Sequence, residues 1–271
     1  MLFGIALALV IAQETDVIRV PVRMVAVPTL VFSKENRLIP GLKKNDFRLL
    51  DNGVPQAVEL DPDVAPVSVV IAIQADRNPH YISKVGSVME AHLVGATGRA
   101  AVIAYNDTIK TLKPFGSGDV RAAFANVSGR STKARMIDAG MRAIEMLKDR
   151  PRTAARVLLF VNQTADRGSK AGWDDLKEAA GREDVAVYSL NSWEDDPVHT
   201  LVEATGGTEL HFHSQKELED AIGKLGVELR SAYLLSFYPS SSAPGVHRIS
   251  VEVSVPGAKT YARPGYTLSP N

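Results

Sequence analysis

The sequence predicts an α/β fold in which a doubly wound, mostly parallel sheet is inserted into a small β-sandwich formed by both chain ends. Residues 69–73 (VVIAI) and 157–161 (VLLFV) are uninterrupted apolar runs, which is typical of parallel strands that helices cover on both faces. Such runs alternate with helical patterns between about residues 66 and 230. Strand patterns flank this block on both sides, and insertion of a domain is tolerated because its two ends often lie close together.

The α/β block is predicted in detail from its hydrophobic periodicity. Strands are expected at residues 67–73, 100–105, 109–113, 156–161, 185–190 and 209–213, and helices at residues 82–94, 119–127, 133–147, 173–180, 197–204 and 216–229. Within residues 133–147, apolar side chains recur at helical spacing, so this helix has one face for the core. Asn106-Asp107 forms a turn between two strands, which gives one antiparallel pair in the sheet.

The flanking segments are β-like. Residues 17–32 are rich in Val, and Pro21 and Pro28 favour an edge or bulged strand. Two short strands follow at residues 47–50 and 56–60, and Asn52-Gly53 supplies the positive φ angles of a tight hairpin between them. The predicted organisation is therefore residues 13–64 and 231–271 as the two halves of a sandwich, with the α/β domain at residues 65–230.

Composition and charge exclude several function classes. The 271 residues hold 31 Lys+Arg and 31 Asp+Glu, so a net charge of zero disfavours nucleic acid and anionic membranes as partners. The absence of cysteine excludes disulfides, thiolate catalysis and Cys-ligated zinc. Residues 1–12 (MLFGIALALVIA) are too short to span a bilayer and resemble the apolar region and cleavage site of a secretory signal, although no Lys or Arg precedes them. We expect an exported protein; the alternative is an N-terminal strand.

Several segments spread along the chain resemble one known family. They are GLKKNDFRLLDNGVPQAV, PVSVVIAI, AYNDTIKTLKPF, MIDAGMRAI, DRGSK after VLLFV, LVEATGGTELHF, AYLLSFYP, HRISVEV and ARPGY. The α/β block resembles the von Willebrand factor A domain, and the order and spacing of all these segments resemble the bacterial VWFA-related proteins common in acidobacteria. The resemblance implies a non-enzymatic protein-interaction or adhesion module.

A domains of this type hold a divalent cation at a metal-ion-dependent adhesion site at the carboxyl end of the sheet. The resemblance implies an Asp-x-Ser-x-Ser segment after the first strand, a Thr before a later helix and an Asp after the fourth strand. These hard oxygen ligands leave one position open for an acidic group of the partner. The aligned positions in this sequence are Gln74 for the first Asp, Asp76 and Asn78 for the two Ser, Ala134 for the Thr (with Thr132 two residues earlier) and Gln163 for the later Asp.

These substitutions predict a degenerate site without a cofactor. An amide oxygen can ligate a cation but does not offset its charge, and Mg²⁺ loses its water reluctantly; Ca²⁺ meets the same charge deficit. We expect partner binding to be independent of metal, at a face that includes Asp76, Arg77, Asn78, Thr132, Gln163 and Asp166. One alternative is a cation-dependent adhesion domain with a rearranged site of Asp76, Asn78, Thr132 and Gln163.

Other candidate chemistry is interpreted as structural. Asp174-Asp175 and residues 194–196 (Glu-Asp-Asp) precede or begin predicted helices, where acidic residues act as caps. His211 and His213 lie on one strand face but lack the further ligands that zinc requires. The sequence contains no G-x-S-x-G or phosphate-loop motif. An α/β hydrolase-type enzyme is the remaining alternative, and it has no recognisable nucleophile and base.

Overall fold

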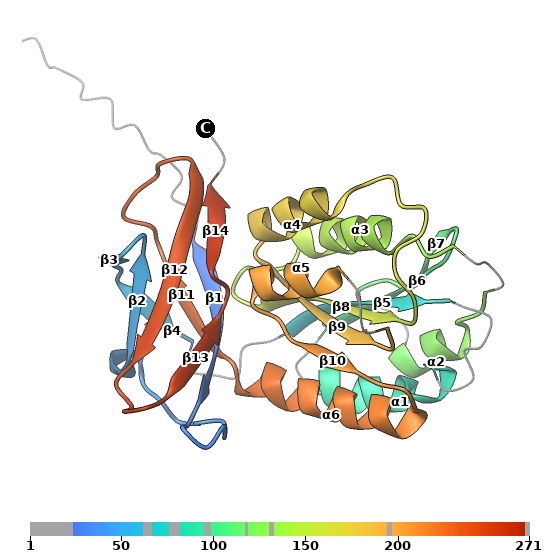
Figure 1. Ribbon diagram of the computed structural model, residues 1–271, viewed down its shortest axis with the longest axis horizontal. Helices are drawn as coiled ribbons and strands as arrows, with labels where there is room; N and C mark the ends of the chain where they lie inside the picture. The colour runs from blue at the N-terminus through green and yellow to red at the C-terminus, as the bar shows by residue number, and fades with distance from the viewer. Residues whose placement is uncertain are drawn as a thin grey trace, which may run out of the picture.

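The computed structural model describes residues 24–61, 67–75, 82–94, 99–116, 119–129, 133–193 and 197–268. These residues form an α/β domain beside a β-sandwich that both ends of the chain build (Figure 1). The predicted signal segment, residues 1–12, and the predicted boundary between residues 64 and 65 lie outside the described ranges.

The α/β domain is organised around a six-stranded sheet of order β10-β9-β8-β5-β6-β7. Its strands are β5 (Val67–Gln74), β6 (Arg99–Tyr105), β7 (Ile109–Lys113), β8 (Ala155–Asn162), β9 (Val185–Asn191) and β10 (Glu209–His211). All neighbours are parallel except β7, which runs antiparallel to β6. The predicted doubly wound, mostly parallel sheet with one antiparallel pair is therefore confirmed.

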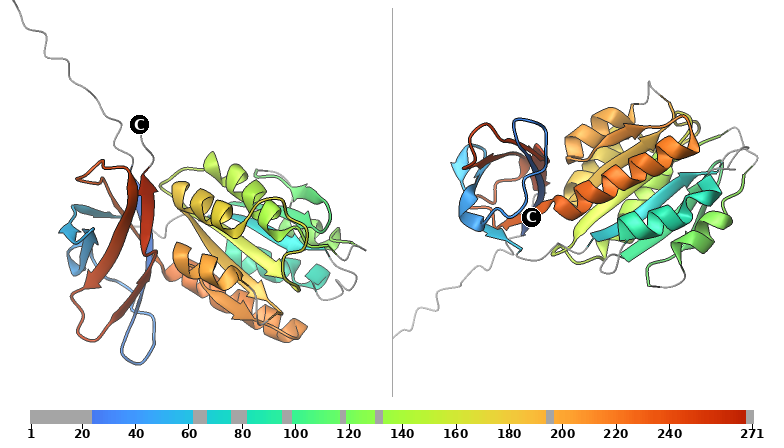
Figure 2. Two further views of the ribbon diagram at one scale, coloured as in Figure 1. Left: turned by 45° about the horizontal axis from the view of Figure 1, so that its top comes forward. Right: turned by 90° about the horizontal axis from the view of Figure 1, so that it is seen from below.

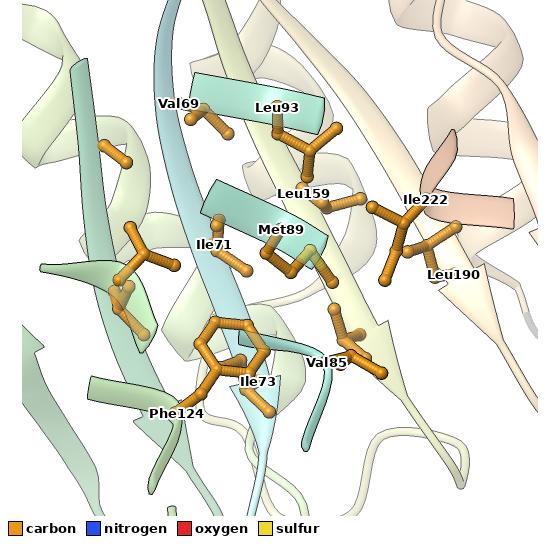
Figure 3. Packing of buried hydrophobic residues seen from close by; sticks show 14 of the residues in the cluster. Val69, Ile71, Ile73, Val85, Met89, Leu93, Phe124, Leu159, Leu190 and Ile222 are labelled. Atoms are coloured by element: carbon orange, nitrogen blue, oxygen red, sulfur yellow. The ribbon is translucent and has the colours of Figure 1, made fainter. Parts of the chain in front are cut away.

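Helices cover both faces of this sheet (Figure 2). One core lies under α1 (Gly86–Met89), α2 (Val120–Ala125) and α6 (Gln215–Ser231); the other lies under α3 (Met136–Lys148), α4 (Trp173–Arg182) and α5 (Val198–Thr205). Because side chains alternate along a strand, the central strand β5 serves both cores. Val69, Ile71 and Ile73 pack into the first core with Met89 and Phe124 (Figure 3), while Val70 and Ala72 pack into the second.

The first helical segment differs from the expected continuous helix at residues 82–94. It consists of a 3-10 turn η2 (Ile82–Lys84), the short helix α1 and a π-helical turn η3 (Glu90–Val94). A Cβ on Gly226 of α6 would lie 2.5 Å from the carbonyl oxygen of His92 in η3, so the two backbones are in close contact. Arg230 of α6 donates to the same carbonyl, which satisfies a backbone group that the irregular turn leaves exposed.

The sandwich consists of two four-stranded sheets, of order β13-β1-β11-β4 and β14-β12-β2-β3. Its strands are β1 (Val25–Phe32), β2 (Phe47–Asp51), β3 (Val54–Pro55), β4 (Val58–Leu60), β11 (Tyr233–Phe237), β12 (Gly245–Val253), β13 (Lys259–Ala262) and β14 (Gly265–Leu268). Asn52 and Gly53, at φ angles of 49° and 81°, form the predicted tight turn between β2 and β3.

Two details of the sandwich correct the sequence-based expectation. The strand expected at residues 56–60 begins only at Val58, as β4, and pairs with β11 in the other sheet; the hairpin partner of β2 is instead β3, which precedes residue 56. The chain thus changes sheets within a few residues. β1 is an inner strand, not an edge strand, because it pairs with β11 on one side and with β13 on the other. The pairing with β13 begins at Thr29, so among the described strands Pro28 lies opposite a residue of β11 only.

A buried ion cluster joins the sandwich to the α/β domain. Arg263, between β13 and β14, donates from Nη1 to Oδ1 of Asp184 at 2.6 Å and from Nη2 to the carbonyl oxygen of Gly181 at 3.2 Å. Arg152 of the α/β domain binds the other oxygen of the same carboxylate. Asp184 and Arg263 are both buried, so this contact between the two parts of the chain excludes water.

Candidate functional site

The residues that the sequence assigns to a site converge at the carboxyl edge of the six-stranded sheet. Gln74 is the last residue of β5, Gln163 directly follows β8, and Asp166 lies in the loop between β8 and α4. The remaining candidates, Asp76, Arg77, Asn78 and Thr132, lie outside the described residues.

Gln74 connects β5 to the loop that follows β8. Its Oε1 accepts hydrogen bonds from the backbone N–H groups of Gln163 at 2.7 Å and Thr164 at 3.0 Å. Its Nε2 donates to the hydroxyl of Thr164 at 2.8 Å. The side chain is only 3% exposed, so these three bonds are formed away from bulk water.

The chemistry of an amide suits this position. A carboxamide presents an acceptor and a donor on one planar group, whereas an ionised carboxylate only accepts. The two N–H groups meet the acceptor, and the Thr164 hydroxyl meets the donor. The side chain of Gln74 therefore joins the strand to the loop through all three hydrogen bonds.

A second set of bonds holds the β8–α4 loop against the start of α3. Ala134 and Arg167 exchange two backbone hydrogen bonds, of 3.2 and 2.8 Å. Asp166 accepts from the Ile137 N–H at 3.1 Å and from the Ser169 hydroxyl at 2.6 Å. Ala134, which the resemblance places at the threonine position, is buried and contributes only backbone groups to these contacts.

Asp138 is a site residue that the sequence does not single out. Its carboxylate accepts from the backbone N–H groups of Lys170 and Ala171 at 3.0–3.1 Å and from the Arg135 guanidinium at 2.6 Å. Burial raises the pKa of Asp138, but the hydrogen bonds from Ala171, Arg135 and Lys170 outweigh this effect and hold its pKa below the ordinary value. The helix was expected from residue 133, but α3 begins at Met136, so Asp138 lies in its first turn, where the sequence did not place it.

Further polar side chains continue along the same edge. The buried Asn162 accepts from the Ser189 hydroxyl at 3.0 Å, and the buried Asn191 donates to Glu209 at 3.2 Å. The other oxygen of Glu209 contacts Nδ1 of His199 at 3.0 Å. These groups satisfy one another, as buried polar groups generally do.

The described residues at this edge do not fit a divalent cation. Oε1 of Gln74 already faces two N–H groups, and the carboxylate of Asp166 faces the Ile137 N–H and the Ser169 side chain. Hard cations need several free oxygen ligands with negative charge. In the part of the chain that the structure describes, no group of three or more His, Asp or Glu side chains could hold a metal ion.

The other sequence candidates have structural positions. Asp175 accepts from the Gly172 N–H at 2.8 Å at the start of α4, which confirms its predicted capping role. β10 ends at His211, two residues before the expected end, and the N–H of His213 donates to Glu217 in the first turn of α6. The acidic residues 194–196 lie outside the described ranges.

A buried cluster in the sandwich contains an Asp, a His and a Tyr, which are residue types that many active sites use, but here they bond to one another and to the backbone. Asp51 accepts from the Tyr266 hydroxyl at 2.8 Å and contacts Nδ1 of His247 at 3.0 Å, while Nε2 of His247 contacts the carbonyl oxygen of Ala243 at 2.8 Å. All three side chains are at most 4% exposed. Both ring nitrogens are engaged with protein groups, so the cluster joins β2, β12 and β14 and offers no free base.

With this geometry established, the fold is that of von Willebrand factor A domains, as the resemblance predicts. A von Willebrand factor type A protein from Catenulispora acidiphila matches with a TM-score of 0.52 and 8% identity, over 93% of this chain and 75% of that chain. Proximal thread matrix protein 1 from the mussel byssus, solved with a zinc-occupied MIDAS motif, matches with a TM-score of 0.52 and 11% identity, over 65% of this chain and 49% of that chain.

These identities define the fold and nothing finer. No family model matches the sequence, and no significant match is found among curated proteins. The narrower resemblance to acidobacterial VWFA-related proteins stays a prediction. Among the described residues, no helix has both the length and the apolar character to cross a membrane.

Proposed function

We propose that the protein is an exported, non-enzymatic interaction module that binds a protein partner at the carboxyl edge of its A-fold sheet, without a metal ion. The observation that carries the proposal is the bonding of Gln74. Its carboxamide joins β5 to the β8–α4 loop through three hydrogen bonds, at the position where the resemblance implies a metal-binding carboxylate.

The arrangement of the loops supports binding by a preformed surface. Ala134, Arg167, Asp166 and Asp138 connect the start of α3 to the β8–α4 loop through backbone and carboxylate hydrogen bonds. A surface held in this way loses little conformational entropy on binding, so a cation is not needed to order it. Export is supported by the signal-like pattern of residues 1–12 and is tested by mass spectrometry of the mature N-terminus: a chain that still begins at Met1 contradicts it.

The metal independence is tested by thermal unfolding with millimolar Mg²⁺ or Ca²⁺ and with EDTA. A ligand that binds only the folded state raises the midpoint of thermal unfolding. Since we propose that no cation binds, the midpoint should be the same in all three conditions. A rise that Asp76→Ala abolishes would instead establish the cation-dependent adhesion site with rearranged ligands.

The binding face is tested by capture of a partner from an envelope extract in EDTA. Since the chain has no cysteine, a single cysteine can carry a bulky maleimide at a chosen position. Asp107→Cys places it on the exposed turn at the end of β6, and Lys259→Cys places it on the sandwich as the matched control. Labelling at residue 107 should abolish capture and labelling at residue 259 should not; the reverse result, or equal capture by both, refutes the assigned face.

A further inference from the structure

The two loops at the carboxyl edge carry charges of both signs, and the two signs have different orientations. The carboxylates of Asp138 and Asp166 point inward, where they accept hydrogen bonds from backbone N–H groups, from Arg135 and from Ser169. Three cationic residues of the same loops are exposed: Lys133, Arg167 and Lys170. We call these three residues the basic rim.

The members of the basic rim are brought together by the bonds between the loops. Lys133 precedes Ala134, which exchanges two backbone hydrogen bonds with Arg167. A Cβ built on Gly168 would lie 3.6 Å from Cδ of Lys133, so the lysine stem runs alongside the β8–α4 loop. Lys170 is fixed through its own N–H, which binds the carboxylate of Asp138. The three cationic residues therefore lie on two loops that hydrogen bonds hold together.

The inward orientation of the acids leaves Lys133, Arg167 and Lys170 as the exposed charges among the described residues of these two loops. Asp138 has a side chain only 12% exposed and is paired with Arg135, so its charge is already balanced. Asp166 is partly buried and engaged with Ile137 and Ser169. A group of like charges on a rigid surface attracts a complementary partner and fixes its register.

We infer that the basic rim binds an acidic segment of a partner protein directly, through ion pairs to Lys133, Arg167 and Lys170; this inference rests on the proposed function. A polypeptide fits the rim better than a nucleic acid does. The chain as a whole has no net positive charge, and nucleic acids are bound mainly through extended basic surfaces that neutralise many phosphates.

The test uses the full chain and a short fluorescein-labelled peptide of Asp and Glu spaced by Gly and Ser, measured by fluorescence anisotropy in EDTA. The matched probe has Asn and Gln in place of the acids, and a single-stranded DNA of equal charge is the third probe. The acidic peptide should bind at low salt at least about tenfold more tightly than the amide peptide, and added salt should weaken its binding.

Charge reversal locates the binding. The triple variant Lys133→Glu/Arg167→Glu/Lys170→Glu should bind the acidic peptide about tenfold or more weakly than the native chain, since three favourable pairs become repulsive. The control Lys34→Glu/Arg37→Glu/Lys259→Glu changes the net charge equally, at exposed positions of the sandwich, and should bind as the native chain does. All comparisons with the three probes are made on variants with a native circular dichroism spectrum, which surface substitutions preserve.

Three results would overturn the inference: equal binding of the acidic and amide peptides, equal losses in both triple variants, or tighter binding of the DNA than of the acidic peptide. These results are distinct from failure of the proposed function. If an envelope partner is captured and labelling at residue 107 blocks it, but rim reversal leaves capture unchanged, only the basic rim is refuted. If the basic rim binds the acidic peptide but no partner is captured at this face, only the proposed function is refuted.

Discussion

Replacing Gln74 by Ala removes the group that connects β5 to the β8–α4 loop. The substitution deletes three hydrogen bonds and leaves the N–H groups of Gln163 and Thr164 without their present acceptor. Each such bond contributes about 0.5–1.5 kcal/mol net, and the site is nearly inaccessible to water. We therefore expect the free energy of unfolding to fall by about 2–4 kcal/mol, which corresponds to a lowering of the thermal midpoint by about 5–10 °C.

Thermal unfolding followed by circular dichroism measures the global effect, and amide hydrogen exchange measures the local one. The N–H groups of Gln163 and Thr164 should exchange faster in Gln74→Ala than in the native chain. Gln215→Ala is the matched control, because the Gln215 side chain donates to Glu219 one turn along α6 and its loss should change stability by less than about 0.5 kcal/mol. Unchanged exchange at both amides would refute the reasoning.

Three further predictions concern charged groups. Asp138→Asn should lower the free energy of unfolding by about 1–3 kcal/mol at neutral pH. Because the pKa of Asp138 in the folded chain is below its ordinary value of 3.8, denaturant titrations should show that the difference between variant and native chain shrinks as the pH falls below 3.8. Burial raises the pKa of Glu228 above its ordinary value of 4.5. The native chain should therefore lose stability relative to Glu228→Gln as the pH rises through that raised pKa, and the same dependence of stability on pH in both chains would contradict this. Arg263→Ala should lower the free energy of unfolding by about 2–4 kcal/mol and speed proteolysis between the sandwich and the α/β domain. A variant as resistant to proteolysis as the native chain would show that the ion pair with Arg152 is sufficient for Asp184.

The main elements of the fold follow from local sequence patterns. The continuous apolar runs predict β5 and β8 because these strands are buried on both faces, and no solvent-facing alternation is possible there. Asn52-Gly53 predicts its hairpin because the turn requires positive φ angles. The assignment of β3 and β4 to different sheets could not be predicted, since it depends on which strand is available to pair with each of them.

The proximity of Gln74 and Gln163 was predicted, but the bonds that Gln74 forms were not. The resemblance identifies Gln74 and Gln163 as neighbours across the edge, and their backbone and side-chain contact agrees with this. The role of Asp138 was missed because its partners, Lys170 and Ala171, are 32 and 33 positions away and bind through backbone groups that carry no residue signature. The cluster of Asp51, His247 and Tyr266 joins positions up to 215 residues apart, which no local pattern reports.

The insertion of the α/β domain determines how the molecule carries a mechanical load. Residues 24 and 268 both belong to the sandwich side of the chain, while the α/β domain is attached through the ends of β4 and β11 and through the contact of Arg263 with Asp184 (Figure 1). Tension applied at those two residues passes through β1 and β14, so it is resisted by the antiparallel pairing of the sandwich. The six-stranded sheet carries none of this pairing, so we expect tension at those two residues to load the sandwich strands before it loads β5 and β8.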